Sequence, residues 1–357
     1  MKPIRASWLL LGLLCLSGLL WATGVCVGST GFENVIHAWL DTNAPDHAMA
    51  SQIVGEIRLP RTLGAWAAGA LLGLAGALAQ GLFRNPLADP YLLGSASGAS
   101  LGVALLLAVL GGGMAAGSMM NGGLPMSLFS GQWLLRLGLT GAAFVGAVVA
   151  VLLTLTLARG VSHTLRLLLA GVIVGVVLGA ATSLILLFSP DSLQAMQAFM
   201  LGTTAFVGWT SCFLMLIVWI VSTAAAWVMA RVLDGLSLGE STAISLGLPL
   251  APLRVALIGV LALATGTAVA QTGLIAFVGL AAPHLVRALV QVSHRWLVIL
   301  ASLMGAVLLS IADQLARWWI APQELPVGVL TAMLGGGYLL WLMHRRNNAL
   351  NHRGGVI

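Results

Sequence analysis

Cysteine and histidine side chains are few in this sequence, and their spacing matches no metal-binding pattern. The three cysteines, Cys15, Cys26 and Cys212, lie in apolar stretches without CxxC spacing, so they predict neither a metal site nor a disulfide framework. HExxH, paired-aspartate and P-loop motifs are all missing from the sequence. We therefore expect no catalytic residue, no metal ligand and no cofactor in this chain. If ATP and Mg²⁺ drive its function, they bind to another protein.

The composition predicts what kind of protein surrounds these few reactive groups. Of 357 residues, 59% are hydrophobic and only 7% are charged, whereas soluble domains carry about 25% charged residues. The mean hydropathy of +1.03 excludes a soluble enzyme, a disordered chain and a disulfide scaffold. The short alternating segments of a membrane β-barrel are absent. These values predict an all-α polytopic membrane protein.

Apolar stretches of about 20 residues can each cross a bilayer as a helix, and the sequence contains ten of them. We read the chain 1–357 as a single transmembrane domain and take the first stretch as an uncleaved span. The eighth is short and contains Pro283. The ten predicted spans are 7–29, 60–83, 91–110, 133–157, 165–188, 205–230, 252–270, 273–290, 296–315 and 326–344.

The basic residues predict the orientation of these spans. With both termini in the cytoplasm, twelve bases lie inside, and only Arg58, Arg61, Arg136 and Arg317 lie outside. Such a bias follows the positive-inside rule. Because the sixteen bases are scattered at span ends, the net charge of +6 does not indicate a nucleic-acid partner.

Acidic residues and histidines avoid the middle of every predicted span. Ion-coupled carriers usually bury acidic groups at mid-membrane, so this pattern argues against a secondary transporter, which stays the alternative class. A membrane cytochrome would need facing histidines within its spans to bind haem iron. The seven histidines instead lie in predicted loops or at span ends.

Glycines recur at four-residue spacing in several predicted spans, where they form smooth helix faces that let another backbone approach. Helix packing within the bundle is one explanation, and a face that lines a translocation path is the other; the spacing does not separate them. The two longest stripes are Gly94, Gly98 and Gly102, and Gly171, Gly175 and Gly179.

Five segments, taken in order on a ten-span plan, carry a family resemblance. They are RLPRTL (58–63), NPLADPYLLG (85–94), LSLGESTAISLG (236–247), GLIAFVGLAAPHLVR (273–287) and ELPVGVLT (324–331). Together they resemble the permease subunits of ABC importers for ferric siderophores, haem and cobalamin. The resemblance covers the chain from about Arg58 to Met343.

The polar loop 234–250 carries apolar residues that a short helix could present to a partner. The resemblance implies that it is the cytoplasmic coupling helix that docks on the ATPase. Gly239 permits a sharp turn, and Glu240 could pair with a base on the ATPase. An amphipathic loop on lipid headgroups is the alternative. The residues assigned to coupling are Leu236, Leu238, Gly239, Glu240, Ala243, Leu246 and Gly247.

The outside arginines Arg58, Arg61 and Arg317 depart from the positive-inside rule. The resemblance implies that they dock to acidic residues of a periplasmic binding protein, where exposed ion pairs set orientation and encounter rate. The alternatives are pairing of Arg58 with Glu56 or with headgroups, and an i,i+4 pair between Arg317 and Asp313.

The resemblance also assigns a cytoplasmic gate to two inside turns of each of two subunits; without it, these would be ordinary turns. The gate residues are Asn85, Pro86, Leu87, Ser162, His163 and Thr164. Near the same inner end, we expect His284 to be a packing or interfacial residue.

The assembly that the resemblance implies has a second copy of this chain, two cytoplasmic ATPase subunits and a periplasmic binding protein, in the bacterial inner membrane. The permease then moves an iron-containing chelate into the cytoplasm. Haem is the favoured substrate, and ferric siderophore and cobalamin are the alternatives.

Overall fold

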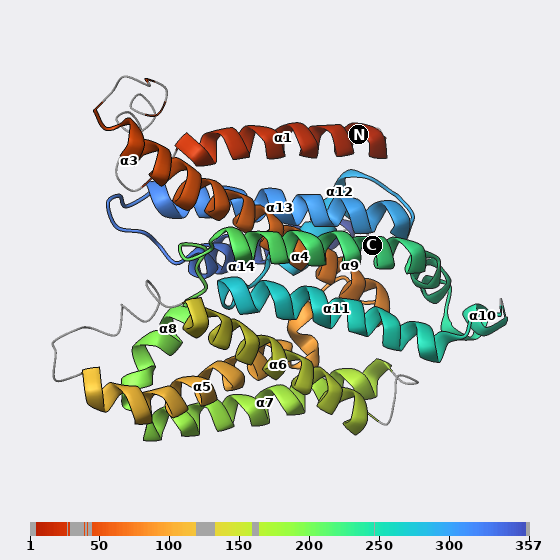
Figure 1. Ribbon diagram of the computed structural model, residues 1–357. Coiled ribbons are helices and arrows are strands. Elements are labelled where there is room, and N and C mark those ends of the chain that lie inside the picture. Colours follow the sequence, from red (N-terminus) through yellow and green to blue (C-terminus); the bar gives the residue numbers. More distant parts are fainter. Residues whose placement is uncertain are drawn as a thin grey trace.

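The computed structural model describes residues 5–26, 28, 39, 41, 45–118, 133–158, 164–245 and 247–354, which form helices and their connecting turns. Each of the ten predicted spans has its helix (Figure 1). These helices are α1 (Ala6–Cys26), α4 (Leu59–Phe83), α5 (Ser95–Ser118), α6 (Trp133–Leu157), α7 (Thr164–Phe188), α9 (Trp209–Ser237), α11 (Leu250–Thr272), α12 (Val278–Leu289), α13 (His294–Trp318) and α14 (Val327–Gly354).

Among the described residues, six short elements lie between or before the long helices. Figure 1 shows α3 and α8 at one end of the bundle and α10 at the other, where α1 begins. We call the α10 end the inner end, because the basic residues predict that it faces the cytoplasm. The short elements are α3 (His47–Gln52), the π-helix η1 (Ile53–Arg58), the 3₁₀ helices η2 (Pro90–Leu93) and η5 (Pro190–Ser192), α8 (Leu193–Leu201) and α10 (Glu240–Ser245).

Within the described residues, seven helices are long and apolar enough to span a membrane, and three further apolar stretches are shorter: Ser95–Val109 of α5, α12, and Val327–Tyr338 of α14. Of the ten helices that match predicted spans, α12 is the shortest, and its 12 residues extend about 18 Å at 1.5 Å per residue. The predicted span 273–290 was therefore placed too early at its start. Gly273 and Phe277 both have positive φ angles, of 69° and 68°, and this irregular backbone delays the helix until Val278. Pro283 lies inside the helix without ending it.

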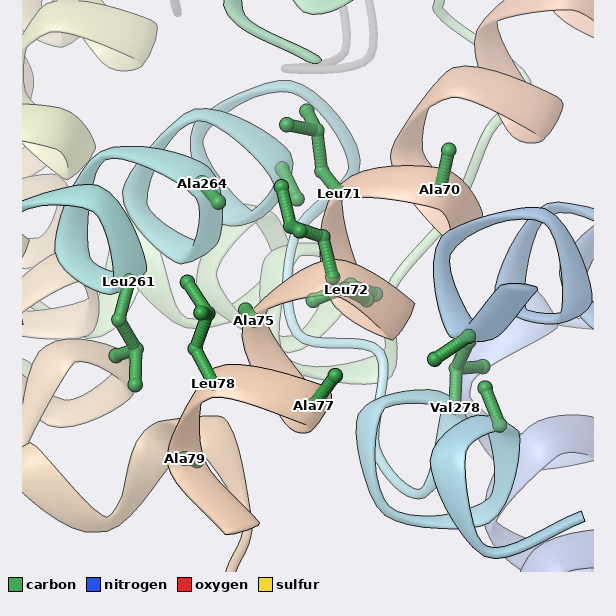
Figure 2. Packing of buried hydrophobic residues seen from close by; sticks show 14 of the residues in the cluster. Ala70, Leu71, Leu72, Ala75, Ala77, Leu78, Ala79, Leu261, Ala264 and Val278 are labelled. Carbon is green, nitrogen blue, oxygen red and sulfur yellow. The ribbon is translucent and has the colours of Figure 1, made fainter. Parts of the chain in front are cut away.

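Helix α4 is the centre of the fold. Its span is 94% buried, because α13, α9, α11 and α12 all pack around it. The sequence of α4 is rich in alanine, glycine and leucine, so neighbouring helices can approach on every side. Figure 2 shows α4 between α11 and α12, with Leu78 on the side of Leu261 from α11 and Val278 from α12 on the other side.

Glycines of α4 make the closest of these approaches. A Cβ atom added at Gly69 or Gly73 would collide with the backbone of α13 at Gly305 or Ala301. One added at Gly76 would collide with the backbone of Gly279 in α12. The α4 glycines therefore allow backbone-to-backbone packing that a side chain would prevent.

The two predicted glycine stripes have different surroundings in the structure. Gly98 and Gly102 of α5 lie against the backbone of α6, and Gly171 of α7 lies against the backbone of Leu92. Gly94 is not in a helix; it precedes α5 with a φ of 80°. The nearest neighbour of Gly175 is Ser97, and Gly179 has no heavy atom within 4 Å of an added Cβ. A pathway role for these last two glycines stays a prediction.

Helices α5, α6 and α7 form a second packing unit beside the α4 core. A smaller apolar cluster, which includes Val103, Ala143 and Met196, holds it to α8 and the end of α11. The outer faces of α1, α6, α7 and α9 are apolar and exposed in the single chain, with only 17 to 28% of their spans buried. These faces require lipid or another protein around them.

The α4–α13 contact makes a testable prediction. Alanine usually stabilises a helix by about 1 kcal/mol relative to glycine, but at Gly73 its methyl group would meet the backbone of Ala301 and Gly305. We expect Gly73→Ala to lower the free energy of unfolding by roughly 1–3 kcal/mol, the usual cost of overpacking. Thermal unfolding in detergent measures the change. Gly12→Ala is the control, because no neighbour lies within 4 Å there; equal melting temperatures for both variants would contradict the prediction.

Candidate functional site

The segment between α9 and α11 forms the predicted short helix at the inner end of the bundle. Helix α9 ends at Ser237, α10 covers six residues, and α11 begins at Leu250. Gly239 and Gly247 flank α10 with φ angles of 110° and 77°, which glycine adopts without strain. The chain can therefore turn sharply on both sides of α10.

The apolar residues of this segment do not form one outward face, as the sequence suggested. Leu236 and Ala243 are fully buried against the chain's own helices, whereas Leu238 and Ile244 are 66% and 63% exposed. The reason is that the end of α9 and one side of α10 pack on each other. Leu238 and Ile244 therefore remain for a partner, and Leu246 lies outside the described residues.

Glu240 forms ion pairs within its own chain. Its Oε1 accepts a hydrogen bond from Arg254 Nη2 at 2.6 Å and lies 3.5 Å from Arg84 Nη2. From the sequence we expected Glu240 to pair with a base on the ATPase. In the structure its carboxylate pairs with two arginines of the permease itself. Arg254 lies near the start of α11, and Arg84 directly follows α4.

One of the two predicted gate turns is described in full. Asn85 Oδ1 accepts a hydrogen bond from the amide of Leu87 at 3.0 Å, so the turn is held by its own side chain. Leu87 is 57% exposed. Of the second turn, Ser162 and His163 lie outside the described residues, and Thr164 begins α7 without a described side chain. The gate assignment stays a prediction.

Just beyond this turn, Asp89 caps the 3₁₀ helix η2. Its Oδ1 accepts a hydrogen bond from the amide of Tyr91 at 2.8 Å. Burial raises the pKa of the Asp89 carboxyl, although this hydrogen bond favours the charged form. The Tyr91 hydroxyl donates to Ile275 O at 3.0 Å. The connection between α4 and α5 is therefore anchored to the irregular segment before α12.

A second polar contact joins α4 to α12. Gln80 Nε2 donates to Leu280 O at 3.1 Å, and Gln80 Oε1 accepts a hydrogen bond from Arg287. Sequence reasoning missed Gln80, although an amide in an otherwise apolar stretch was a visible signal. His284 packs edge to face on Tyr338, with ring centroids 6.0 Å apart, which agrees with the expected packing role.

The outer end of the bundle contains a buried charge cluster built around Asp313 of α13. Arg61 Nε lies 3.3 Å from Asp313 Oδ1, and Arg61 Nη2 lies 2.8 Å from Glu324 Oε2. Arg317, one turn further along α13, also pairs with Asp313, and Thr204 donates a hydrogen bond to the same carboxylate. We call Arg61, Thr204, Asp313, Arg317 and Glu324 the outer cluster.

Arg58 and Arg317 donate hydrogen bonds to the last backbone carbonyls of α1. Arg317 Nη1 donates to Gly24 O, and Arg58 Nη1 donates to Val25 O and Cys26 O, all at 3.1 Å. The last carbonyls of a helix have no partners within it, and cations are favourable at this end of the helix dipole. The two arginines therefore fix the outer end of α1 to the end of η1 and to α13.

The three arginines predicted to dock a binding protein are thus not exposed side chains. Arg58, Arg61 and Arg317 are 4%, 7% and 2% exposed. For Arg317, the structure contains the alternative that the sequence offered, the i,i+4 pair with Asp313. Arg58 binds the carbonyls of α1 rather than resting as a free surface charge. A docking role for these residues stays a prediction.

A cavity of about 100 Å³ lies between α5, α6, α8 and α11. Its lining is mostly apolar and includes Phe199 and Phe206, with polar groups from Thr140, Ser211 and Gln271. Among the residues that the structure describes, no group of histidine, cysteine, aspartate or glutamate could hold a metal ion.

The outer cluster predicts a large effect of one uncharged substitution. Asp313→Asn would leave Arg61 and Arg317 buried without their shared carboxylate, and the loss of one partner of a buried ion pair costs about 3–5 kcal/mol. We expect a correspondingly lower midpoint of unfolding in detergent. Asp191→Asn is the matched control, because Asp191 is exposed at the same end. Similar midpoints for the two variants would show that the outer cluster does not stabilise the fold.

Comparisons with known proteins agree with this architecture. The model of the FecCD transport family matches residues 10–345. The hemin transport system permease protein HmuU of Yersinia pestis is 38% identical over 295 residues, which are 82% of this chain and 83% of HmuU. The vitamin B12 import system permease protein BtuC of Escherichia coli O17:K52:H18 is 37% identical over 337 residues, 93% of this chain and 94% of BtuC.

A solved structure shares the fold over nearly the whole chain. It is an ABC transporter assigned to the metal-chelate type, in an inward-facing conformation, with a TM-score of 0.77 and 26% identity over 95% of this chain and 99% of the other. Permeases of this kind are not catalytic, and ATP binds to a separate ATPase subunit. Complexes with an ATPase and a binding protein are typical of them. The chain belongs to the FecCD transport family, as a multi-pass membrane permease of a bacterial ABC importer for haem, cobalamin or siderophore-type substrates.

Proposed function

We propose that this permease moves haem from the periplasm to the cytoplasm. The support is the 38% identity to a hemin transport permease over 82% of the chain. Cobalamin is the second candidate, because the vitamin B12 permeases are nearly as similar and cover more of the chain. Ferric siderophore is the third, as a substrate of the same family.

Two copies of the chain form the proposed pathway at their interface. Helices α6, α7 and α9 support this arrangement, because they leave long apolar faces exposed in the single chain. Val176 and Leu187 of α7, for example, are 68% and 73% exposed. Part of this surface faces lipid, and the rest is available to the second copy.

Helix α10 is the proposed docking element for each of two ATPase subunits. Leu238 and Ile244 supply exposed apolar surface at the inner end, and apolar side chains of a short helix fit a groove on a partner. The gate residues Asn85, Pro86 and Leu87 follow α4 at the same end of the bundle. ATP-driven movement at α10 would thus act close to the proposed gate.

The binding protein is proposed to dock at the outer end, around Arg58, Arg61 and Arg317. The support is the family resemblance at these positions, together with their positive charge at that end. Since these side chains are buried and paired, docking has to use their electrostatic potential or a rearrangement of their pairs. Glu324, whose side chain is 28% exposed, is the outer-cluster carboxylate most accessible to such a rearrangement.

Substrate assignment is tested on the binding protein, because it is the subunit that selects the cargo. We expect the cognate binding protein, purified from its native host, to retain haem, with its absorption in the Soret region. Titration with haem, cyanocobalamin and a ferric siderophore should then give the tightest dissociation constant for haem. Tighter binding of cobalamin or siderophore would overturn the haem assignment while leaving the importer intact.

The transport mechanism is tested in proteoliposomes that contain the permease and its ATPase, with loaded binding protein outside. Uptake should require ATP on the ATPase side and should survive collapse of the proton and sodium gradients. Uptake that follows an ion gradient without ATP would instead support a secondary transporter.

The docking role of α10 predicts the effect of a charge on its exposed face. Ile244→Asp would bury a carboxylate at the ATPase contact, and an unpaired buried charge is strongly unfavourable. We expect at least a tenfold weaker affinity for the ATPase, or about 1.4 kcal/mol, measured by co-purification and by light scattering. Ile320→Asp is the control, since Ile320 is also exposed but lies in the turn after α13 at the outer end. Full retention of the ATPase by Ile244→Asp would contradict the docking role.

A further inference from the structure

Glu240 is the first residue of α10, and its carboxylate joins elements that are far apart in the sequence. The pair with Arg254 is short, at 2.6 Å, and the Arg254 side chain is only 7% exposed. Charge-assisted hydrogen bonds of this length are the stronger kind. The contact with Arg84 is longer, at 3.5 Å, and more open to solvent.

The two arginines that pair with Glu240 belong to membrane helices or directly follow one, so they connect α10 to those helices. Arg254 belongs to the first part of α11, which packs on α4, α6 and α9. Arg84 ends α4 in a left-handed conformation, with a φ of 49°, and directly precedes Asn85 of the proposed gate. A carboxylate between them therefore connects α10 to α11 and to the end of α4.

Two glycine turns and the packing of Ala243 set the position of α10. Gly239 and Gly247 form the turns on either side of it with positive φ angles, which glycine adopts without strain. The buried Ala243 and the hydrogen bond from Leu248 N to Ala243 O fix α10 against α9 and its own following turn. Figure 1 shows α10 at the extreme inner end, beyond the start of α11. The ion pairs of Glu240, the first residue of α10, connect it to Arg84 after α4 and to Arg254 in α11. Through these pairs, a displacement of α10 can move the end of α4, next to the proposed gate.

We propose that Glu240 is a positioning residue for transport: it holds α10 to Arg254 and Arg84, so that displacement of α10 by the ATPase moves the end of α4 and the gate. The proposal rests on the proposed docking of the ATPase at α10. It differs from a direct contact between Glu240 and a base on the ATPase, because the carboxylate acts here within the permease.

The test measures gate movement separately from ATPase binding. Cys15, Cys26 and Cys212 are the cysteines to remove, and Leu87→Cys, at an exposed position, receives an environment-sensitive fluorophore. The complex with the ATPase is reconstituted in nanodiscs, and the change in fluorescence on adding ATP reports the gate. Co-purification of the ATPase is recorded for every variant.

Glu240→Gln keeps the size of the side chain and removes its charge. We expect the ATPase to remain bound and the ATP-dependent fluorescence change to fall about two- to fivefold, in line with the modest strength of a partly exposed ion pair. Arg254→Gln should give most of this loss, because the pair with Arg254 is the shorter of the two, whereas Arg254→Lys, which retains the charge, should keep most of the response. The double variant Glu240→Gln/Arg254→Gln should be no worse than Glu240→Gln alone, because that single change already removes the pair with Arg254.

Arg231→Gln is the matched control. Arg231 is an exposed base at the inner part of α9, and its replacement should leave the gate response unchanged. If Arg231→Gln reduced the ATP-dependent fluorescence change as much as Arg254→Gln does, the effect would come from the total positive charge at the inner end and not from the pair with Glu240. That result would overturn the proposal.

Two further results would overturn the positioning role. If Glu240→Gln releases the ATPase while Arg254→Gln retains it, Glu240 contacts the ATPase directly. If Glu240→Gln leaves the fluorescence change intact in complexes that still hold the ATPase, the carboxylate transmits no movement. Failure of the docking role itself is recognised separately, by retention of the ATPase in Ile244→Asp.

Discussion

The close packing of α4 on α13 is the contact on which the rest of this fold depends. At Gly69 and Gly73, the backbones of the two helices meet with no side chain between them. In a bilayer, apolar side chains gain little by leaving lipid, so association relies on close van der Waals packing and on hydrogen bonds. Ser302 of α13 adds such a bond to Ala70 O of α4, at 3.0 Å. Helices α1, α9, α11, α12 and α14 pack on this pair, and the α5–α7 unit lies beside them.

The helices could be predicted well from the sequence, whereas the ion pairs between their side chains could not. Both outcomes have physical reasons. Span length and apolarity are local properties, and so are the glycines that bound α10. Arg61 and Asp313, by contrast, are 252 positions apart, and no local spacing indicates that they meet. Of the ion pairs in the outer cluster, only the one between Arg317 and Asp313 could be predicted from sequence spacing, because the two residues are four positions apart on one helix. The irregular backbone at Gly273 and Phe277, which delays α12, also depends on packing rather than composition.

The outer cluster shows why the charges outside the positive-inside pattern are tolerated. Each buried arginine either shares Asp313 or fills the open carbonyls at the end of α1. Buried charges persist only with such compensation. These arginines therefore have a structural function in this conformation, whatever further part they take in docking. A partner that attracts them must compete with the carboxylates and carbonyls that already bind them.

The distribution of close packing indicates where the permease can move. The α4–α13 core and the α5–α7 unit are each tightly packed, with glycine contacts inside both. Between them lies the cavity bordered by α5, α6, α8 and α11. Packed interiors resist continuous deformation, so domains usually move as rigid bodies along looser boundaries. Relative motion of the two units at this boundary breaks fewer close contacts than motion inside either unit. Helix α11 borders the cavity near one end and carries Arg254 near the other, so the tie from Glu240 reaches the helix that lies along this boundary.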